Sequence, residues 1–203
     1  MIRFILMSAA CSLLIAAGSV TAPGYEVGDA VANFKLKNIT GKYVSLSDYE
    51  ASKGLIVVFD CNTCPFSKAY NDRIIALNKK YASKGFPLVA INANDPSKSP
   101  GDSFENMVSY AKDHSYDFPY LIDETQSVAQ TFGATNTPHV FVLSKSGKEF
   151  KVAYIGAIDN NSRDAASADK KYVEEAIDAL IAEKAVPTLK TKAIGCTIKW
   201  KNS

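Results

Sequence analysis

The sequence has few of the residues that build metal and haem sites. Only 2 histidines occur among 203 residues, and the 4 cysteines include a single CxxC pair, Cys61 and Cys64. A structural zinc site needs about four ligands, and neither a second CxxC nor a paired-histidine motif is present to complete one. Covalent haem attachment would require histidine directly after the second cysteine, where this chain has Pro65. We therefore expect no metal and no cofactor at the pair.

A strong excess of charge of either sign is also missing. The net charge is +2 with 22% charged residues, which does not favour a nucleic-acid partner. With 47% hydrophobic residues, a chain of this length can bury a sizeable core without staples. Internal repeats are absent, and no stretch of the sequence marks a domain boundary. The composition is that of one near-neutral globular domain.

The longest apolar stretch lies at the N-terminus, within residues 1–22. Arg3 precedes the apolar residues Phe4–Ala17, and Val20 and Ala22 stand at positions −3 and −1 of a cleavage site. This pattern predicts a signal peptide and therefore an exported protein, periplasmic or secreted. An uncleaved membrane anchor is less favoured because the apolar run is short for a membrane span. We expect no stable membrane insertion after the signal is removed, and three cysteines in the mature chain.

The CxxC pair stands between a predicted strand and a predicted helix. Residues 55–59 are β-branched and apolar, as in a buried strand, whereas residues 66–81 repeat apolar side chains at helical spacing. Pro65 fits the first turn of a helix and disfavours helical geometry at Cys64, so the helix should begin at Pro65. Helix N-termini favour negative charge, and the thiolate is the nucleophile in disulfide exchange. The placement therefore predicts a redox-active dithiol.

The rest of the chain alternates between strand and helix patterns. Val31–Ile39 and 43–46 form a predicted hairpin, and residues 87–92 complete a βαβ unit with the strand before the CxxC. Asp102–Glu105 has the pattern of a capping box. Further predicted elements are a strand at 118–122, a short helix at 128–132, a hairpin over 140–154 and a last helix at 173–181.

Several segments together resemble the thioredoxin-fold redoxins, which join thiol-specific antioxidants to exported thioredoxin-like proteins. Residues 27–36 and 41–49 resemble the N-terminal hairpin of that family, and 118–123 and 132–138 match its later pattern. The resemblance covers about Tyr25 to Ile158. It implies an α/β, thioredoxin-like three-layer sandwich, with a central mixed sheet flanked by helices and an N-terminal β-hairpin extension. The implied organisation is a signal peptide at 1–22, a redoxin domain at 23–185 and a C-terminal tail at 186–203.

The resemblance also assigns roles to individual residues. Thr137 and Pro138 would form a cis-proline turn facing the dithiol, with the Thr137 backbone free to align an extended substrate chain. Cys61 would attack and Cys64 would resolve the mixed disulfide. A helix that begins at Pro65 benefits Cys64 as much as Cys61, so the order of attack stays open.

Two chemistries occur among the redoxins. Peroxidases of the family carry a threonine three residues before the peroxidatic cysteine and a proline four residues before that threonine. If Cys64 were peroxidatic, Cys61 and Val57 would occupy these positions, so both features are lost. We therefore favour a thiol-disulfide oxidoreductase that acts on protein disulfides and receives electrons from a separate reductase. A peroxiredoxin-like thiol peroxidase is one alternative, and a copper(I) carrier with His139 as third ligand is another.

Three further residues are auxiliary candidates. Asp60 stands where thioredoxin has an aromatic residue, and its carboxylate opposes thiolate formation unless its charge is directed into solvent. Either water or Asp60 would take up the proton during ring closure. His139 is a candidate base, with a packed strand residue as the alternative. Cys196 would resolve a mixed disulfide at Cys61, pair between chains, or lie shielded beside Trp200.

Overall fold

The structure is a computed structural model that describes residues 24–202. The predicted signal peptide, including Cys11, lies outside the described residues. The strands are β1 (Lys35–Asn38), β2 (Tyr43–Ser45), β3 (Gly54–Phe59), β4 (Leu88–Asn92), β5 (Tyr120–Ile122), β6 (Asn136–Thr137), β7 (His139–Ser146), β8 (Glu149–Gly156) and β9 (Cys196–Thr197). The α-helices are α1 (Pro65–Tyr81), α2 (Phe104–Asp113), α3 (Ser127–Phe132) and α4 (Tyr172–Ile181), and 3-10 turns cover Leu46–Tyr49, Ala82–Lys84 and Pro100–Asp102.

Seven strands form the central sheet in the order β2-β1-β5-β4-β3-β7-β8. The pairs β3–β4 and β4–β5 are parallel, whereas β1, β7 and β8 join their neighbours antiparallel, so the sheet is mixed. The predicted βαβ unit is therefore present as β3, α1 and β4. The β1–β2 hairpin adds to one edge of the sheet through β1 and β5. This is the thioredoxin-like arrangement that the sequence predicted.

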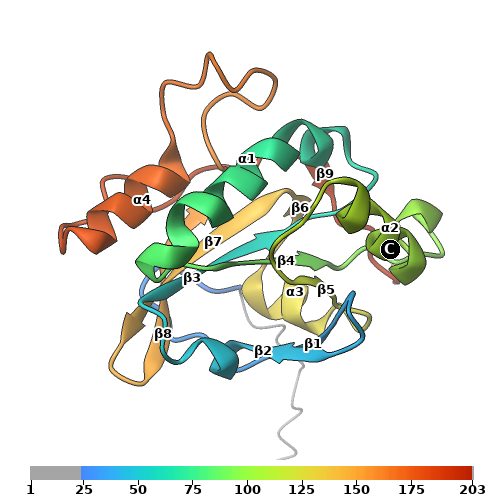
Figure 1. Ribbon diagram of the computed structural model, residues 1–203, viewed down its shortest axis with the longest axis horizontal. Coiled ribbons are helices and arrows are strands. Elements are labelled where there is room, and N and C mark those ends of the chain that lie inside the picture. The colour runs from blue at the N-terminus through green and yellow to red at the C-terminus, as the bar shows by residue number, and fades with distance from the viewer. Residues whose placement is uncertain (1–23, 203) are drawn as a thin grey trace, which may run out of the picture.

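Helices cover both faces of the sheet. Figure 1 shows α1 and α4 on one face and α3 on the other. Alternate residues of β3 divide between the two layers: Ile56 and Val58 pack with α1 and α4, and Leu55, Val57 and Phe59 pack on the α3 side. Every residue of β3 is buried, as its continuous apolar sequence predicted.

The first helix begins where the proline requires it. Cys64 is the N-cap residue, with extended backbone angles of φ −70° and ψ 125°, and Pro65 occupies the first helical position. Proline has no N–H to donate, which costs nothing in the first turn of a helix. This confirms the predicted helix start, and it places Cys64 at the helix terminus with Cys61 in the preceding turn.

The start of α2 differs from the predicted capping box. The N-cap is Ser103, whose hydroxyl accepts from the Asn106 N–H at 3.3 Å. Asp102 lies one residue earlier, in the 3-10 turn, and is fully buried. Its carboxylate binds the CxxC loop instead of capping the helix, so the prediction was wrong by one residue.

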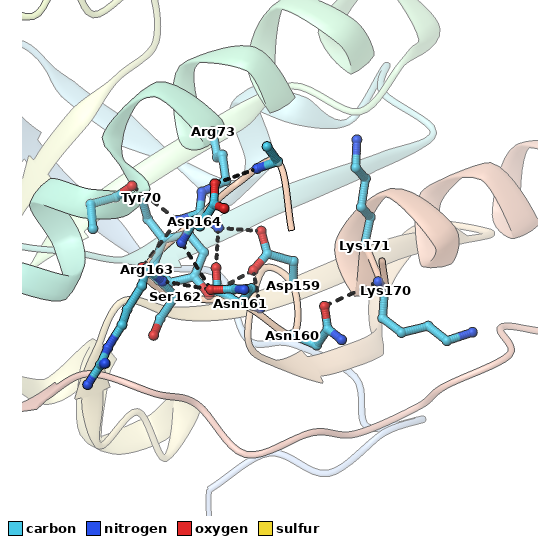
Figure 2. Close-up of polar contacts among 12 residues, drawn as sticks. Tyr70, Arg73, Asp159, Asn160, Asn161, Ser162, Arg163, Asp164, Lys170 and Lys171 are labelled. Carbon is cyan, nitrogen blue, oxygen red and sulfur yellow. Dashed lines mark hydrogen bonds and ion pairs between the residues drawn. The ribbon is translucent and has the colours of Figure 1, made fainter. Parts of the chain in front are cut away.

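The loop between β8 and α4 is tied to α1 by a buried ion pair. Arg73 Nη1 donates to Asp159 Oδ2 and to the Asn161 carbonyl, both at 2.6 Å, and Tyr70 donates to Asp159 Oδ1 at 2.9 Å. Arg73 Nη2 adds a 3.3 Å bond to the Ser162 carbonyl. Figure 2 shows these groups converging on the loop. The network anchors α1, the helix whose N-cap residue is Cys64, to this loop.

We expect Asp159→Ala to destabilise the protein by about 2–4 kcal/mol, because it leaves the Arg73 guanidinium without its counter-charge. The Arg73 side chain is only 15% exposed, so water compensates it poorly. Chemical denaturation measures the change. Asp169→Ala in the same loop is the control, because Asp169 is exposed and its loss should change stability by less than about 0.5 kcal/mol. Equal effects of the two variants would contradict the role of the ion pair.

Candidate functional site

The two cysteines of the CxxC motif lie against the turn before β7. Both are free thiols, 1% and 2% exposed. Cys61 Sγ lies 3.1 Å from the hydroxyl of Thr137, and Cys64 Sγ donates to the Thr137 carbonyl at 3.1 Å. The Thr137–Pro138 peptide bond is cis. The structure thus brings together the four residues that the sequence placed in the site.

Hydrogen-bond donors surround the sulfur of Cys64. The thiol of Cys61 is the largest influence that lowers its pKa, followed by the thiol of Cys196 and by the N–H groups of Ser67 and Cys196. The Cys196 N–H lies 3.4 Å from the sulfur, and the Ser67 N–H lies near it without the geometry of a full helix cap. Burial and the Thr137 carbonyl, which suits only the neutral thiol, act in the opposite direction. The donors, above all the Cys61 thiol, outweigh these effects and hold the pKa of Cys64 below its usual range.

Cys61 has the opposite surroundings. Its hydrogen bond to Cys64 raises its pKa most, then burial, then the nearby carboxylates of Asp60 and Asp102. Only the hydroxyl of Thr137 acts in the other direction. When the pair loses one proton, the negative charge therefore belongs on Cys64, with Cys61 as the neutral donor.

Asp60 is buried directly beside the dithiol. The sequence left open whether its charge is directed into solvent, where it would not oppose thiolate formation. Asp60 is 2% exposed, so its charge is not directed into solvent. Burial raises its pKa to about 7, although hydrogen bonds from Ser67 and from the Cys61 N–H partly oppose this. Among the described residues its Oδ1 has no hydrogen-bond partner. A buried carboxyl with a pKa near neutral can take up and release a proton under ordinary conditions.

Ser67 connects the two groups. Its hydroxyl lies 3.9 Å from Cys61 Sγ and is near enough to the Asp60 carboxyl to lower the pKa of that group. Ser67 is 1% exposed and stands in the first turn of α1. Sequence reasoning missed this residue, although its position three after Cys64, facing back toward the helix start, was a readable signal.

A second buried carboxylate, Asp102, holds the CxxC loop in place. Its Oδ1 accepts from the Asn62 N–H at 2.7 Å, and its Oδ2 accepts from the Thr63 hydroxyl at 2.7 Å. Asn94 and Ser99 donate to Oδ2 as well, at 2.9 and 2.6 Å. The two residues between the cysteines are thus fixed from outside their own loop. Sequence reasoning missed this role as well.

We expect Asp102→Ala to cost on the order of 3 kcal/mol of stability, because several buried donors would lose their acceptor at once. Denaturant unfolding of the reduced protein measures the loss. Asp113→Ala, in the exposed last turn of α2, is a control that should change little. A loss no larger than that of the control would show that the donors find other acceptors.

His139 is directed away from the dithiol. It is on β7, where Val140 and Val142 face α1 and α4, and its own ring packs 4.8 Å from that of Phe141 on the opposite side. Its Nδ1 accepts from the Thr135 N–H at 3.4 Å. Burial lowers its pKa to about 4, with a smaller contribution from Lys190, so the ring is neutral. Within residues 24–202 no group of three or more His, Cys, Asp or Glu side chains is arranged to hold a metal ion.

The C-terminal tail completes the site. Cys196 on β9 pairs with Thr137 on β6, and Thr197 pairs with Asn136. The resemblance had implied that the Thr137 backbone is free to align a substrate chain. In the structure the protein's own tail is paired with it instead. Cys196 is partly exposed and lies beside Cys64.

The sheet, the cis-proline turn and the facing thiols define a thioredoxin-fold redoxin. Residues 27–151, more than half of the chain, match the AhpC/TSA family, and the chain belongs to this family. Within residues 24–202 no helix has the length and apolar character needed to cross a membrane.

Similar proteins include a "Thiol-disulfide oxidoreductase ResA" from Bacillus thuringiensis subsp. konkukian. It is 26% identical over 126 residues, which are 61% of this chain and 66%, just under two thirds, of that protein. An uncharacterized conserved protein from Geobacillus kaustophilus has a solved structure with a TM-score of 0.80 and 36% identity, covering 87% of this chain and 93% of that one. A hypothetical protein from Sinorhizobium meliloti 1021 has a TM-score of 0.81 and 31% identity, covering 89% and 97%. The likeness supports thiol redox chemistry in general.

Proposed function

We propose that the protein is an exported thiol-disulfide oxidoreductase that reduces or exchanges protein disulfides through Cys61 and Cys64. The observation that carries the proposal is the asymmetric pair of thiols at the start of α1. One sulfur is surrounded by donors, and the other is buried near two carboxylates that raise its pKa. Such a pair has its nucleophile and its proton donor already distinguished.

In the proposed reaction, the Cys64 thiolate attacks one sulfur of the substrate disulfide. A bond forms between Cys64 and that sulfur, and the other substrate sulfur leaves as a thiolate. Cys61 then attacks Cys64 Sγ, which closes the Cys61–Cys64 disulfide and releases the second substrate thiolate. Two electrons pass from the dithiol to the substrate. A separate dithiol reductase returns them to the protein.

The proton of Cys61 must leave as Cys61 attacks. Asp60 is placed to accept it, because the Ser67 hydroxyl lies between Cys61 Sγ and the carboxylate. With a pKa of about 7, Asp60 can deliver the proton onward to the departing thiolate. We therefore assign proton uptake during ring closure to Asp60, the alternative to water that the sequence had left open.

Reduction of insulin by the reduced protein tests the function, with a dithiol as electron donor and the Cys64→Ser variant as comparison. We expect turnover with the native chain and about a hundredth of it or less with the variant, because the thiol that attacks the substrate is then missing. Rapid oxidation of the dithiol by hydrogen peroxide, without reaction with insulin, would instead establish a thiol peroxidase. Tight copper(I) binding with slow disulfide exchange would establish a carrier.

Export has its own test. We expect the chain recovered from outside the cytosol to begin at Pro23, because Val20 and Ala22 define the cleavage site. N-terminal sequencing of the exported protein measures this. Recovery of the full chain with Met1 from the membrane fraction would establish an anchor instead.

A further inference from the structure

The C-terminal tail forms a short strand beside the cis-proline turn. β9 pairs antiparallel with β6, and the Ile198 N–H donates to the Thr135 carbonyl at 3.0 Å. Asn136 Nδ2 also donates to the Gly195 carbonyl at 2.9 Å. Figure 1 shows β9 next to β6, close to the first turns of α1. The tail is therefore a wall of the redox site.

Gly195 permits the tail to approach this closely. A Cβ atom at this position would lie 2.1 Å from the Thr137 carbonyl oxygen, so no residue with a side chain fits here without moving the backbone. Ile198 is 3% exposed and packs with the core on the α3 side of the sheet. Further along, the Lys199 N–H donates to Asn94 Oδ1 at 2.9 Å. These contacts hold the two residues between Gly195 and Ile198, Cys196 and Thr197, in a fixed register.

That arrangement sets Cys196 against Cys64. The Cys196 N–H donates to Cys64 Sγ at 3.4 Å, and the Cys196 thiol lies near enough to help lower the pKa of Cys64. Cys64 therefore has a thiol partner on each side, Cys61 within its own loop and Cys196 from the tail. Cys61 and Cys64 are 1% and 2% exposed, whereas Cys196 is partly exposed. Of the three described cysteines, Cys196 is the one a partner reaches most directly.

We propose that Cys196 is a third thiol of the redox centre, and that the disulfide passes from Cys61–Cys64 to Cys64–Cys196. The Cys196 thiolate attacks Cys64 Sγ, forming the Cys64–Cys196 bond and breaking the Cys61–Cys64 bond. Cys61 leaves as a thiolate and takes up the proton that Cys196 lost. One disulfide replaces another, so the step needs no outside oxidant or reductant.

The step moves the oxidised bond from a buried position to one that a reducing partner can approach. A partner dithiol would attack Cys196 Sγ, form a mixed disulfide with the tail, and release Cys64 as the favoured thiolate. This inference deepens the proposed function, because it rests on the same dithiol chemistry. It assigns the exposed contact with the electron donor to the tail.

Disulfide mapping of the full chain tests the proposal. Cys61→Ser and Cys64→Ser are each treated with glutathione disulfide, quenched in acid, alkylated and cut with trypsin. Trypsin releases Cys64 in peptide 54–68 and Cys196 in peptide 193–199. We expect the linked pair of peptides in Cys61→Ser, at about tenfold or more the amount in Cys64→Ser, because the tail holds Cys196 beside Cys64 and so raises the effective concentration of its thiol. In the oxidised native chain, fragmentation of the linked pair should place its bond on Cys64.

Glutathione adducts without linked peptides in Cys61→Ser would overturn the proposal, as would equal linking in the two variants. A native chain that yields only the Cys61–Cys64 bond would overturn the exchange step. The mapping reads the bond and not turnover, so the two proposals fail separately. Linked peptides in a protein that does not reduce insulin would refute the proposed function alone. Insulin reduction without linked peptides would refute only the role of Cys196.

Discussion

Cys64→Ser should lower the rate of the first attack on a disulfide by about a hundredfold or more, because the remaining Cys61 thiol is almost entirely protonated at neutral pH. Even without its bond to Cys64, Cys61 stays buried near the carboxylates of Asp60 and Asp102, and all three effects keep its pKa raised. The double variant Cys61→Ser/Cys196→Ser should retain the first attack and accumulate a mixed disulfide on Cys64, because neither neighbouring thiol can then resolve it. Stopped-flow mixing with an aromatic disulfide, followed by peptide mapping, measures both.

The pH dependence separates this order of attack from the reverse one. Free thiols react slowly with iodoacetamide below about pH 8, because they are then mostly protonated. The pKa of Cys64 lies below its ordinary value, so its alkylation should stay fast well below that pH. Thiolate absorbance in the ultraviolet should vanish in Cys64→Ser. In Cys61→Ser it should persist over a narrower pH range, because the Cys61 thiol, the largest influence that lowers the pKa of Cys64, is gone while the other donors remain. If the signal followed Cys61 instead, the order implied by the thioredoxin resemblance would hold and the charge distribution around Cys64 would be misassigned.

The sequence predicted the elements that carry a strong hydrophobic pattern. The buried run of β3 and the helical period of α1 have one interpretation each, and Pro65 fixes the point where the helix begins. These local signals were sufficient to place the CxxC pair at a strand-to-helix junction. The resemblance then supplied Thr137 and Pro138, which lie more than seventy residues away along the chain.

The surroundings of the thiols could not be predicted in the same way, because they depend on long-range packing. Asp102 has the sequence pattern of a helix cap, and only the fold shows that the CxxC loop lies over it. β9 has two residues, too few to show any period, so the tail had no signal that would pair Cys196 with Thr137. The burial of Asp60 was open for a similar reason. A single carboxylate after a strand faces water or protein according to what covers it.

The burial of Asp60 leads to a second expected result, which concerns stability. In the folded protein its pKa is about 7, compared with the ordinary 3.8 of the unfolded chain. Between these values the unfolded chain releases the proton and the folded protein keeps it, so this group's contribution to stability falls as pH rises from about 4 to 7. The loss is on the order of 4 kcal/mol at most. Asparagine has no proton to release, so Asp60→Asn removes this dependence.

We expect Asp60→Asn to gain stability relative to the native chain as pH rises from about 4 to 7, by a few kcal/mol. The difference between the two proteins is the quantity to measure, by denaturant unfolding of the reduced forms across this range. Cys64 acts in the opposite sense, because its lowered pKa stabilises the fold as pH rises, and the comparison cancels much of that contribution. Asp113→Asn, in the exposed last turn of α2, should show no such trend. A constant difference across the range would mean that Asp60 is ionised throughout.

Asp60→Asn, which should stabilise the fold, should at the same time slow the redox chemistry. Without a carboxylate behind Ser67, the Cys61 thiol has no acceptor for its proton, and closure of the Cys61–Cys64 disulfide should become rate-limiting. The first attack by Cys64 needs no such acceptor, so Asp60→Asn should leave its rate nearly unchanged while the mixed disulfide persists about tenfold longer or more. Equal slowing of both steps would show instead that Asp60 only shapes the loop. Asp60 would then weaken the fold at neutral pH and speed disulfide closure. A cost in stability with a gain in activity is expected of a residue whose role is chemical.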